Sequence, residues 1–264
     1  MRRDFSMAKT RNTAALSLQR RNEIKKWLLE EKTLTVAALS NRFNVTYETI
    51  RRDLEILEKE GFLKKVYGGA ALNERVQNKV DFSTLVELFS ESKQLIAKKA
   101  AQFIRENDCI FLDSSTTAYH LAAEITDSNL TVMSNSLKVL SKLSEYPSIN
   151  VTGVGGTLDR INYSFLGASA CAQLANFHLD KAFISCSALD MTYGLSDKYE
   201  EVGILHKTVM KNSNEVFLIV DHTKFNKVAF SIFENFEKVK AIITDQKPSV
   251  AWCNFLAEND ILCY

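Results

Sequence analysis

Hydroxyl side chains gather directly after an apolar run in the second half of the chain. The run Cys109–Leu112 is strand-sized, and a helical pattern begins just beyond it. Unpaired amides at a helix start, together with hydroxyls, suit a phosphate group, and Lys224 or Arg160 would supply the balancing positive charge. The same hydroxyls would equally serve as helix caps, and capping does not exclude binding. The predicted phosphate cradle consists of Asp113, Ser114, Ser115, Thr116 and Thr117.

Other polar residues and glycines follow the neighbouring apolar runs. Ser134-Asn135-Ser136 comes after one run, and the segment 153–157, rich in glycine, comes after the next. If the strands are parallel, their carboxyl ends share one edge of the sheet, where ligands bind. Aspartates there could accept hydrogen bonds from sugar hydroxyls, whereas the glycines form a weak motif that is equally typical of a tight turn. The further residues predicted to bind the ligand are Asn135, Gly155, Gly156, Asp221 and Lys224.

The elements that must position these groups alternate along the chain. Short apolar runs recur, and most are separated by segments with helical periodicity, such as Ile96-Ala100-Phe103. This alternation is typical of an α/β fold with a largely parallel sheet, which is the class expected for the larger part of the chain. The runs begin near Cys109, Leu130, Ile149, Ala182, Val216, Val239 and Ile261.

Catalysis is a competing interpretation of the same region. An aldose–ketose isomerase needs a carboxylate base and an electrophile, and both chemical types are present. The residues of suitable type are Asp190, Glu200, Glu201, Lys207, Asp221 and Lys224. The four histidines lack the spacing of metal ligands, so we predict neither a metal ion nor a cofactor.

The first quarter of the chain has a different electrostatic character. Residues 1–72 contain 15 lysines and arginines against 9 acidic residues, whereas the remaining residues contain 18 against 23. The two parts carry net charges of +6 and −5. A small basic module beside a larger acidic one is expected when the first contacts a polyanion.

Three short helices and a β-wing are predicted in the basic part. The spacing of apolar residues predicts the helices, and cap residues predict where the helices begin and end. A strand over 62–67 and a turn at Gly68-Gly69 follow them. The residues that define the helices are Ile24, Trp27 and Leu28, then Thr35 to Asn44, then Thr46 with Ile50, Leu54, Leu57 and the terminating Gly61.

The outer face of the third helix carries polar side chains that serve no core. A helix–turn–helix places this part of its second helix in the major groove, and wings lie along phosphates. The competing interpretation is that Arg51 and Arg52 pair with nearby glutamates on a solvated face. Asp53 is negative and lies beside the core stripe, so we expect a structural ion pair or hydrogen bond there rather than contact with DNA. The predicted DNA contacts are Thr46, Tyr47, Thr49, Arg51, Arg52, Lys64, Lys65 and Tyr67.

These residues resemble a known family. Thr49-Ile50-Arg51-Arg52-Asp53-Leu54, with Leu57, Gly61 and Tyr67-Gly68-Gly69-Ala70, resembles the DNA-binding module of DeoR-type bacterial transcription regulators. Residues 85–245 resemble the effector domain of that family, which is similar to the fold of ribose-5-phosphate isomerase. The matches are the 113–117 loop, Ser134-Asn135, Gly155-Gly156, Phe165-Leu166-Gly167 and the run 221–225. Ser115 departs from the pattern, because glycine is frequent there, and its Cβ could displace the ligand.

The resemblance implies a repressor of a carbohydrate-use operon. Its partners would be double-stranded operator DNA and a phosphorylated sugar or related metabolite, and retained catalysis is not expected. The alternatives are an isomerase-like enzyme and an assembly protein that responds to no metabolite. Because one small helix–turn–helix has too little surface to specify a genomic site, we expect a homodimer or higher homo-oligomer.

The expected organisation has four parts: a mobile basic arm at 1–16, a winged helix–turn–helix at 17–72, a linker or exposed helix at 73–90, and an effector-sensing and oligomerisation domain at 91–264. No apolar run approaches the roughly 18 residues of a spanning helix, and the amino terminus does not read as a secretory signal. We therefore expect no membrane contact and a cytoplasmic protein. The five scattered cysteines are expected to be reduced, small and buried.

Overall fold

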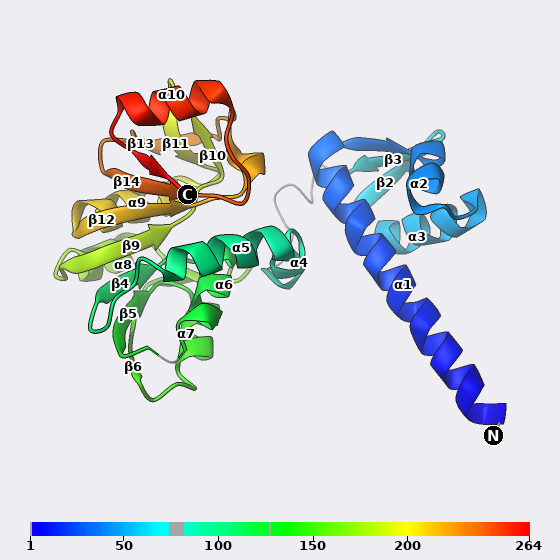
Figure 1. The fold of residues 1–264 in the computed structure, drawn as a ribbon, viewed down its shortest axis with the longest axis horizontal. Helices are drawn as coiled ribbons and strands as arrows, with labels where there is room; N and C mark the ends of the chain where they lie inside the picture. Colours follow the sequence, from blue (N-terminus) through cyan, green and yellow to red (C-terminus); the bar gives the residue numbers. More distant parts are fainter. Residues whose placement is uncertain (1, 74–81, 127) are drawn as a thin grey trace. The chain divides into compact units, whose positions relative to one another are not determined.

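The computed structural model describes residues 2–73, 82–126 and 128–264, which fall into two units, Met1–Phe89 and Ser90–Tyr264 (Figure 1). Each unit has its own buried apolar core. Among the helices of these described residues, none is long and apolar enough to cross a membrane.

Cap residues set the helix ends of the first unit as predicted. Thr35 Oγ1 accepts a hydrogen bond from the Ala38 amide at 3.1 Å, and Thr46 Oγ1 accepts one from the Thr49 amide at 3.3 Å. Gly61, at φ 75°, follows the third helix of the predicted set. The elements are α1 (Arg2–Glu31), β1 (Thr33–Thr35), α2 (Val36–Phe43), α3 (Tyr47–Lys59), β2 (Leu63–Val66), β3 (Gly69–Leu72) and α4 (Phe82–Glu87).

Helix α1 is longer than predicted. It begins at Arg2 and so includes residues for which we expected an arm without regular structure. The physical reason is local, because neither proline nor glycine interrupts residues 2–31. Part of the expected linker is also helical, as α4 lies within 73–90, while residues 74–81 lie outside the described part of the chain.

A three-stranded antiparallel sheet completes the first unit. Its order is β1-β3-β2, with Leu34 opposite Ala70 and Lys65 opposite Ala70 on the other side. The β2–β3 hairpin is the predicted wing, whereas β1 was not predicted. The core beneath this sheet includes Ile24, Leu28, Leu39, Ile50, Leu54, Leu57, Phe62 and Leu63.

Seven parallel strands form the centre of the second unit, in the order β15-β14-β12-β9-β4-β5-β6. This confirms the predicted α/β fold with a parallel sheet. Each predicted apolar run corresponds to one of these strands. Their bounds are β4 (Cys109–Leu112), β5 (Leu130–Ser134), β6 (Ile149–Gly153), β9 (Leu179–Ile184), β12 (Ser213–Ile219), β14 (Val239–Ile243) and β15 (Leu262–Cys263).

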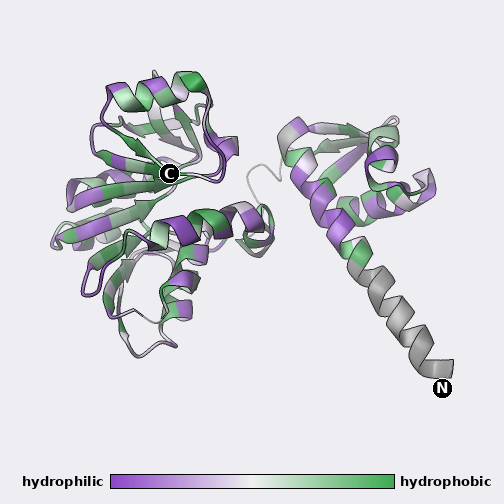
Figure 2. Cartoon of the chain, in the orientation of Figure 1, coloured by the Kyte–Doolittle hydropathy of each residue, from purple (hydrophilic) through white to green (hydrophobic). Residues whose placement is uncertain are grey.

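Helices cover both faces of this sheet. Ile110 and Leu112 of β4 pack in one cluster with α5, α6 and α7, whereas Phe111 between them packs in the other cluster with α8, α9 and α10. The central strands are accordingly hydrophobic in Figure 2. The helices are α5 (Ser90–Ala101), α6 (Thr116–Glu124), α7 (Leu137–Leu143), α8 (Ala168–Leu174), α9 (Glu200–Lys211) and α10 (Val250–Glu258).

Two small antiparallel sheets, which the sequence did not predict, flank the parallel one. One pairs β7 (Thr157–Asp159) with β8 (Ser164–Leu166), and the other joins β10 (Ala188–Asp190), β11 (Gly194–Asp197) and β13 (Ser231–Glu234). A 3-10 turn, η1 (His222–Lys224), follows β12. All five cysteines are free thiols, but only Cys186 is buried, so the expectation of buried cysteines was wrong for the other four.

Candidate functional site

The outer face of α3 and the wing present most of the predicted DNA contacts to solvent. Tyr47 is 51% exposed, and Tyr67, at the tip of the wing, is fully exposed. Thr46 is tied to the helix start as its cap, and Thr49 is half-buried beside it. The other predicted contacts, which are all exposed, are Arg51, Arg52, Lys64 and Lys65.

Two of these cations have acidic neighbours. Arg52 Nε lies 3.5 Å from Glu48 Oε1, but both side chains are mostly exposed, so the pair is weak and leaves Arg52 accessible. Lys65 Nζ lies 3.5 Å from carboxylates of both Glu55 and Glu58, which neutralise it more fully. The competing interpretation, in which Arg51 and Arg52 pair with glutamates, is therefore met by the weak pair of Arg52, whereas Glu55 pairs with Lys65 and no ion pair of Arg51 occurs among the described residues.

Asp53 has the structural role predicted for it. It is 3% exposed, and its Oδ2 accepts a hydrogen bond from Arg20 Nε at 2.5 Å. Arg21 Nη1 lies 3.6 Å from Oδ1. The carboxylate therefore joins α1 to α3 and sets the position of the outer face of α3.

At the carboxyl edge of the parallel sheet, Asp113 follows β4 and is buried. Its Oδ1 accepts from the Ser115 amide at 2.9 Å, and its Oδ2 accepts from the Ser185 amide, after β9, at 2.7 Å. Asp113 thus joins two neighbouring strand ends. Both carboxylate oxygens of Asp113 accept hydrogen bonds from backbone amides of the surrounding loops. This differs from the expected role, in which Asp113 accepts hydrogen bonds from sugar hydroxyls.

The start of α6 keeps backbone donors available. Ser115 caps the helix, with its side chain accepting from the Ala118 amide at 3.1 Å and its backbone extended at φ −72°. No glycine is therefore required at this position. Within the described residues the amides of Ser114, Thr116 and Thr117 make no hydrogen bond, so they remain free to bind an anion.

Asn135 and the glycines occupy the next two strand ends. Asn135 is 1% exposed, and its Nδ2 donates to the Phe165 carbonyl at 3.2 Å. The Gly155 amide donates to Gln173 Oε1 at 2.8 Å. A Cβ on Gly156 would lie 2.5 Å from the Leu166 carbonyl oxygen. The close approach of the backbone therefore explains Gly156 without a ligand, whereas a Cβ on Gly155 would meet only Gln173 Oε1, at 3.7 Å.

Asp221 and Lys224 follow β12 on the other side. Asp221 is buried, and its Oδ1 accepts from the Thr223 amide at 2.9 Å, which closes the turn η1. Lys224 forms no ion pair within the described residues. Burial, then the carboxylates of Asp197 and Asp113, raises the pKa of the Cys186 thiol to about 12, whereas Lys224 opposes this rise. Cys186 is therefore a neutral thiol among these charged groups.

The predicted ligand residues do not all fit one small molecule. Gly155 follows β6 and Asp221 follows β12, and four strand spacings, about 19 Å, separate these strands. A sugar phosphate is shorter than that. Asp113, in the middle, is next to Asn135 on one side and two strands from Asp221 on the other, so a single ligand is best centred at β4.

His206 is a candidate that the sequence analysis did not select. It lies on α9, is 3% exposed, and its Nε2 is 3.3 Å from Asp113 Oδ2. It falls on the apolar stripe of α9 with Leu205 and Val209, where a histidine is more often structural. Only the packing of α9 near the end of β4 could reveal it.

The possible isomerase groups are dispersed. Asp190 Oδ1 accepts from the amides of Thr192 and Tyr193 in the β10–β11 turn. Lys207 is exposed and lies 3.8 Å from Glu234. Glu200 and Glu201 are exposed in the first turn of α9.

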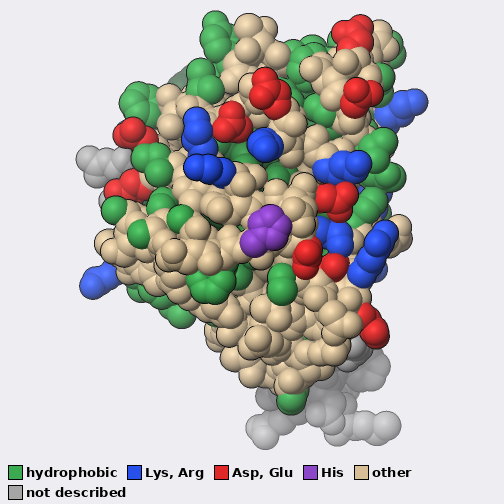
Figure 3. Space-filling model, turned by 90° about the vertical axis from the view of Figure 1, so that its left-hand side faces the viewer, with side chains coloured by type: hydrophobic (Ala, Val, Ile, Leu, Met, Phe, Trp, Pro, Cys, Tyr) green, Lys and Arg blue, Asp and Glu red, His purple; other side chains and the backbone are tan. Residues whose placement is uncertain are grey.

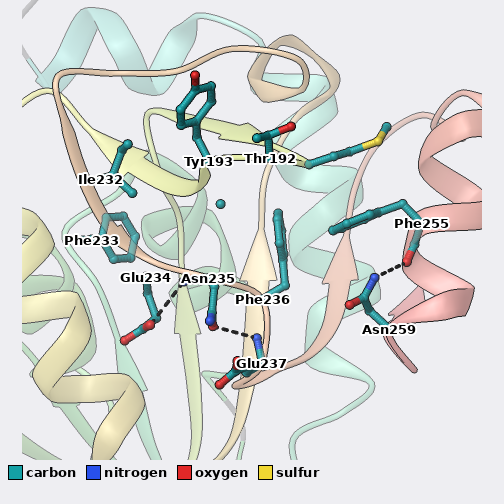
Figure 4. Close-up of a pocket in the computed structure, with 12 residues that line it drawn as sticks. Thr192, Tyr193, Ile232, Phe233, Glu234, Asn235, Phe236, Glu237, Phe255 and Asn259 are labelled. Atoms are coloured by element: carbon teal, nitrogen blue, oxygen red, sulfur yellow. Dashed lines mark hydrogen bonds between the residues drawn. The ribbon is translucent and has the colours of Figure 1, made fainter.

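A pocket of about 430 Å³ lies elsewhere in this unit (Figure 4). Tyr193, Ile232, Phe236 and Phe255 are among its lining residues, and none of the predicted ligand residues lines it. The face drawn in Figure 3 mixes basic and acidic side chains and has no patch of a single charge, so it does not resemble a DNA-binding surface.

Comparison with protein families identifies both units. Residues 20–76 match the model of the DeoR-like helix-turn-helix domain, and residues 89–246 match that of the DeoR C terminal sensor domain. The second match alone covers more than half of the chain.

Curated relatives and solved structures give the same picture. The chain is 36% identical to the uncharacterized HTH-type transcriptional regulator YulB of Bacillus subtilis, over 87% of this chain and 89% of that protein. It is 32% identical to the lactose phosphotransferase system repressor of Staphylococcus aureus, over 86% of this chain and 91% of that protein. A ribose 5-phosphate isomerase A from Methanocaldococcus jannaschii is similar at a TM-score of 0.39 and 18% identity, over 52% and 55% of the two chains, a likeness that supports no functional conclusion.

Proposed function

Because the chain belongs to the DeoR family of transcriptional regulators, we propose that it represses genes of carbohydrate use and that a phosphorylated sugar controls its affinity for operator DNA. One observation carries the proposal. The same chain joins an exposed α3 bearing Arg51 and Arg52 to a sheet edge where the amides of Thr116 and Thr117 are free. The name of the lactose phosphotransferase system repressor supports both repression and a sugar signal.

In this proposal the phosphate binds at the start of α6. The free amides and the helix dipole favour an anion, and the hydroxyls of Ser114 and Thr116 add donors. Lys224, which has no ion-pair partner among the described residues, would balance the charge. Asn135 would contact the carbon chain, whereas Gly155, Gly156 and Asp221 would shape the surrounding loops.

Control of DNA binding would follow from linkage. The effector changes operator affinity only by as much as it binds one arrangement of the DNA-binding modules better than another. Two or more chains on a repeated operator would provide the required specificity, so we propose a homodimer or higher homo-oligomer that acts in the cytoplasm. In this proposal residues 17–72 bind DNA and residues 91–264 bind the effector.

We further infer that the sensor unit does not catalyse isomerisation. Asp113 and Asp221 hold loop amides, Asp190 holds a hairpin turn, and Lys207 is exposed. The carboxylates and the lysine considered for isomerisation are therefore engaged in turns or dispersed, rather than brought together as a base and an electrophile.

The test is to recover operator DNA with the purified full-length chain from fragments of its own genome, and then to titrate the complex with pentose and hexose phosphates. We expect one sugar phosphate to change operator affinity while its unphosphorylated sugar does not. Conversion of that sugar phosphate in the absence of DNA would favour the enzyme, and an operator complex indifferent to all metabolites would favour the assembly protein.

A further inference from the structure

Two buried polar atoms in the described part of the chain have no hydrogen-bond partner. They are Asn135 Oδ1 and His206 Nδ1, and the two residues are 1% and 3% exposed. Leaving a buried acceptor unpaired costs free energy, so in folded proteins such an atom normally has a partner from the protein, an ordered water molecule or a ligand.

Both atoms belong to residues beside Asp113. Strands β4 and β5 are in register with Leu112 opposite Ser134, so Asp113 and Asn135 follow adjacent strands at the same level. His206 approaches from α9, with its Nε2 3.3 Å from Asp113 Oδ2. The two unpaired groups therefore belong to residues from different elements that both neighbour Asp113, and α6 begins three residues after Asp113.

Their partners fix which way each group must point. Asn135 Nδ2 donates to the Phe165 carbonyl, which can only accept, so an exchange of the amide oxygen and nitrogen would oppose two oxygens. His206 Nε2 lies 3.3 Å from Asp113 Oδ2, an oxygen that can only accept, so we assign the ring proton that faces Asp113 to Nε2. Asn135 Oδ1 and His206 Nδ1 are then both acceptors, and each needs a donor.

We propose that Asn135 Oδ1 and His206 Nδ1 each accept a hydrogen bond from a hydroxyl group of the effector, and so read its sugar chain. This rests on the proposed function and deepens it. Phosphate oxygens are predominantly acceptors at neutral pH and would repel these two atoms, so the phosphate belongs at α6 and the hydroxyls at Asn135 and His206. The ligand class is therefore a phosphate ester with at least two free hydroxyls, and neither inorganic phosphate nor a phosphorylated acid without hydroxyls satisfies the site.

The test measures the binding of matched phosphates to the full-length protein by calorimetry. Ribose 5-phosphate is compared with 2-deoxyribose 5-phosphate, glucose 6-phosphate with 2-deoxyglucose 6-phosphate, and fructose 6-phosphate with 1-deoxyfructose 6-phosphate, with inorganic phosphate alongside. For the phosphate that binds, we expect its deoxy partner to bind at least about 10-fold more weakly, because a buried acceptor is left unpaired.

Variants connect that discrimination to the two atoms. Asn135→Ala removes one acceptor, and His206→Gln removes the acceptor at Nδ1 while its amide can still donate to Asp113. The variant whose lost acceptor pairs with the missing hydroxyl should weaken the full sugar and bind the deoxy partner as the native chain does, whereas the other variant should weaken both. Lys224→Gln is the matched control from the phosphate end, and should weaken both ligands equally. Tyr193→Ala, in the separate pocket, should change neither.

The possible outcomes separate this inference from the function on which it rests. Equal affinities for full and deoxy sugars in the native chain would overturn the hydroxyl sites and leave a phosphate-sensing regulator intact. Binding by none of the panel would overturn both the effector and its hydroxyl sites, whereas DNA binding would stand. The comparison of full and deoxy sugars uses the native chain, so it does not depend on whether a variant folds. A nitrogen-15 spectrum that places the ring proton of His206 on Nδ1 would overturn the proposed hydrogen bond to that atom.

Discussion

Arg20 Nε donates a hydrogen bond of 2.5 Å to Asp53 Oδ2, and this contact joins the long first helix to the inner side of α3. Asp53 is buried and Arg21 lies on its other oxygen. Because α3 carries the exposed arginines, the orientation of the proposed DNA-reading face depends on a carboxylate that never meets solvent. Asp53 is thus a positioning residue within the family motif.

Replacing Asp53 with asparagine should loosen α3. The change leaves Arg20 and Arg21 without a counter-charge, and because both arginines are partly exposed we expect a loss of about 2 kcal/mol, less than for a fully buried pair. Hydrogen exchange of the α3 amides, which reports on this unit alone, should accelerate about 30-fold. Glu48→Gln, at the exposed pair with Arg52, should leave exchange nearly unchanged, and equal exchange in both variants would contradict the role of Asp53.

Replacing Arg52 with alanine should weaken operator binding without unfolding the chain. The Arg52 side chain is 75% exposed, so its loss removes little packing, while a bidentate contact to a base is worth about 1–3 kcal/mol. Binding curves on operator and on scrambled DNA would measure the change in specificity. Arg105→Ala removes the same charge from an exposed site on the sensor unit and is the control. Unchanged operator affinity in Arg52→Ala would mean that another face of α3 meets the DNA.

Local signals explain why so much of the fold could be predicted. Thr35, Thr46 and Gly61 act on residues within a few positions of themselves, and their caps occur as the sequence indicates. The apolar runs of the parallel strands are also local, since a strand buried on both faces is hydrophobic at every position. By contrast, Thr33–Thr35 is too short for any periodicity, and its pairing with β3 is set by tertiary contacts.

The ligand site could be predicted only in part, because its composition depends on strand order. The sequence places Asp113, Asn135, Gly155 and Asp221 after strands, but it does not say that β4 lies between β5 and β9. Without that order, residues about 19 Å apart enter one predicted site. His206 was missed for the same reason, since its proximity to Asp113 comes from the packing of α9 near the sheet edge.

The two lysines of the wing should differ in their effect on salt dependence. Lys65 faces the carboxylates of Glu55 and Glu58, whereas Lys64 forms no ion pair with any residue in the described ranges. Each phosphate contact that releases a counterion adds about 0.9 to the slope of log affinity against log salt. Lys64→Ala should therefore lower the slope by about 1, and Lys65→Ala by distinctly less. Binding from low to moderate salt would measure both slopes, and a larger effect of Lys65→Ala would show that DNA displaces its glutamate partners.

Asp245 should make the sensor unit lose stability in acid. Burial alone would raise the pKa of its carboxyl, but hydrogen bonds from the His222 ring at 2.7 Å, from Ser92 and from the His222 amide hold the pKa below its usual value. In the unfolded chain the Asp245 carboxyl has an ordinary aspartate pKa of about 3.9, so it binds a proton more readily than in the folded chain. The stabilisation is complete above that pH and is lost as the pH falls through the folded-state pKa. Asp245→Asn should therefore flatten the decline of unfolding free energy below about pH 4, whereas Asn in place of the exposed Asp260 should not. Urea unfolding at a series of pH values would measure both, and parallel curves for Asp245→Asn and the native chain would mean that His222 and Ser92 do not favour the ionised carboxylate.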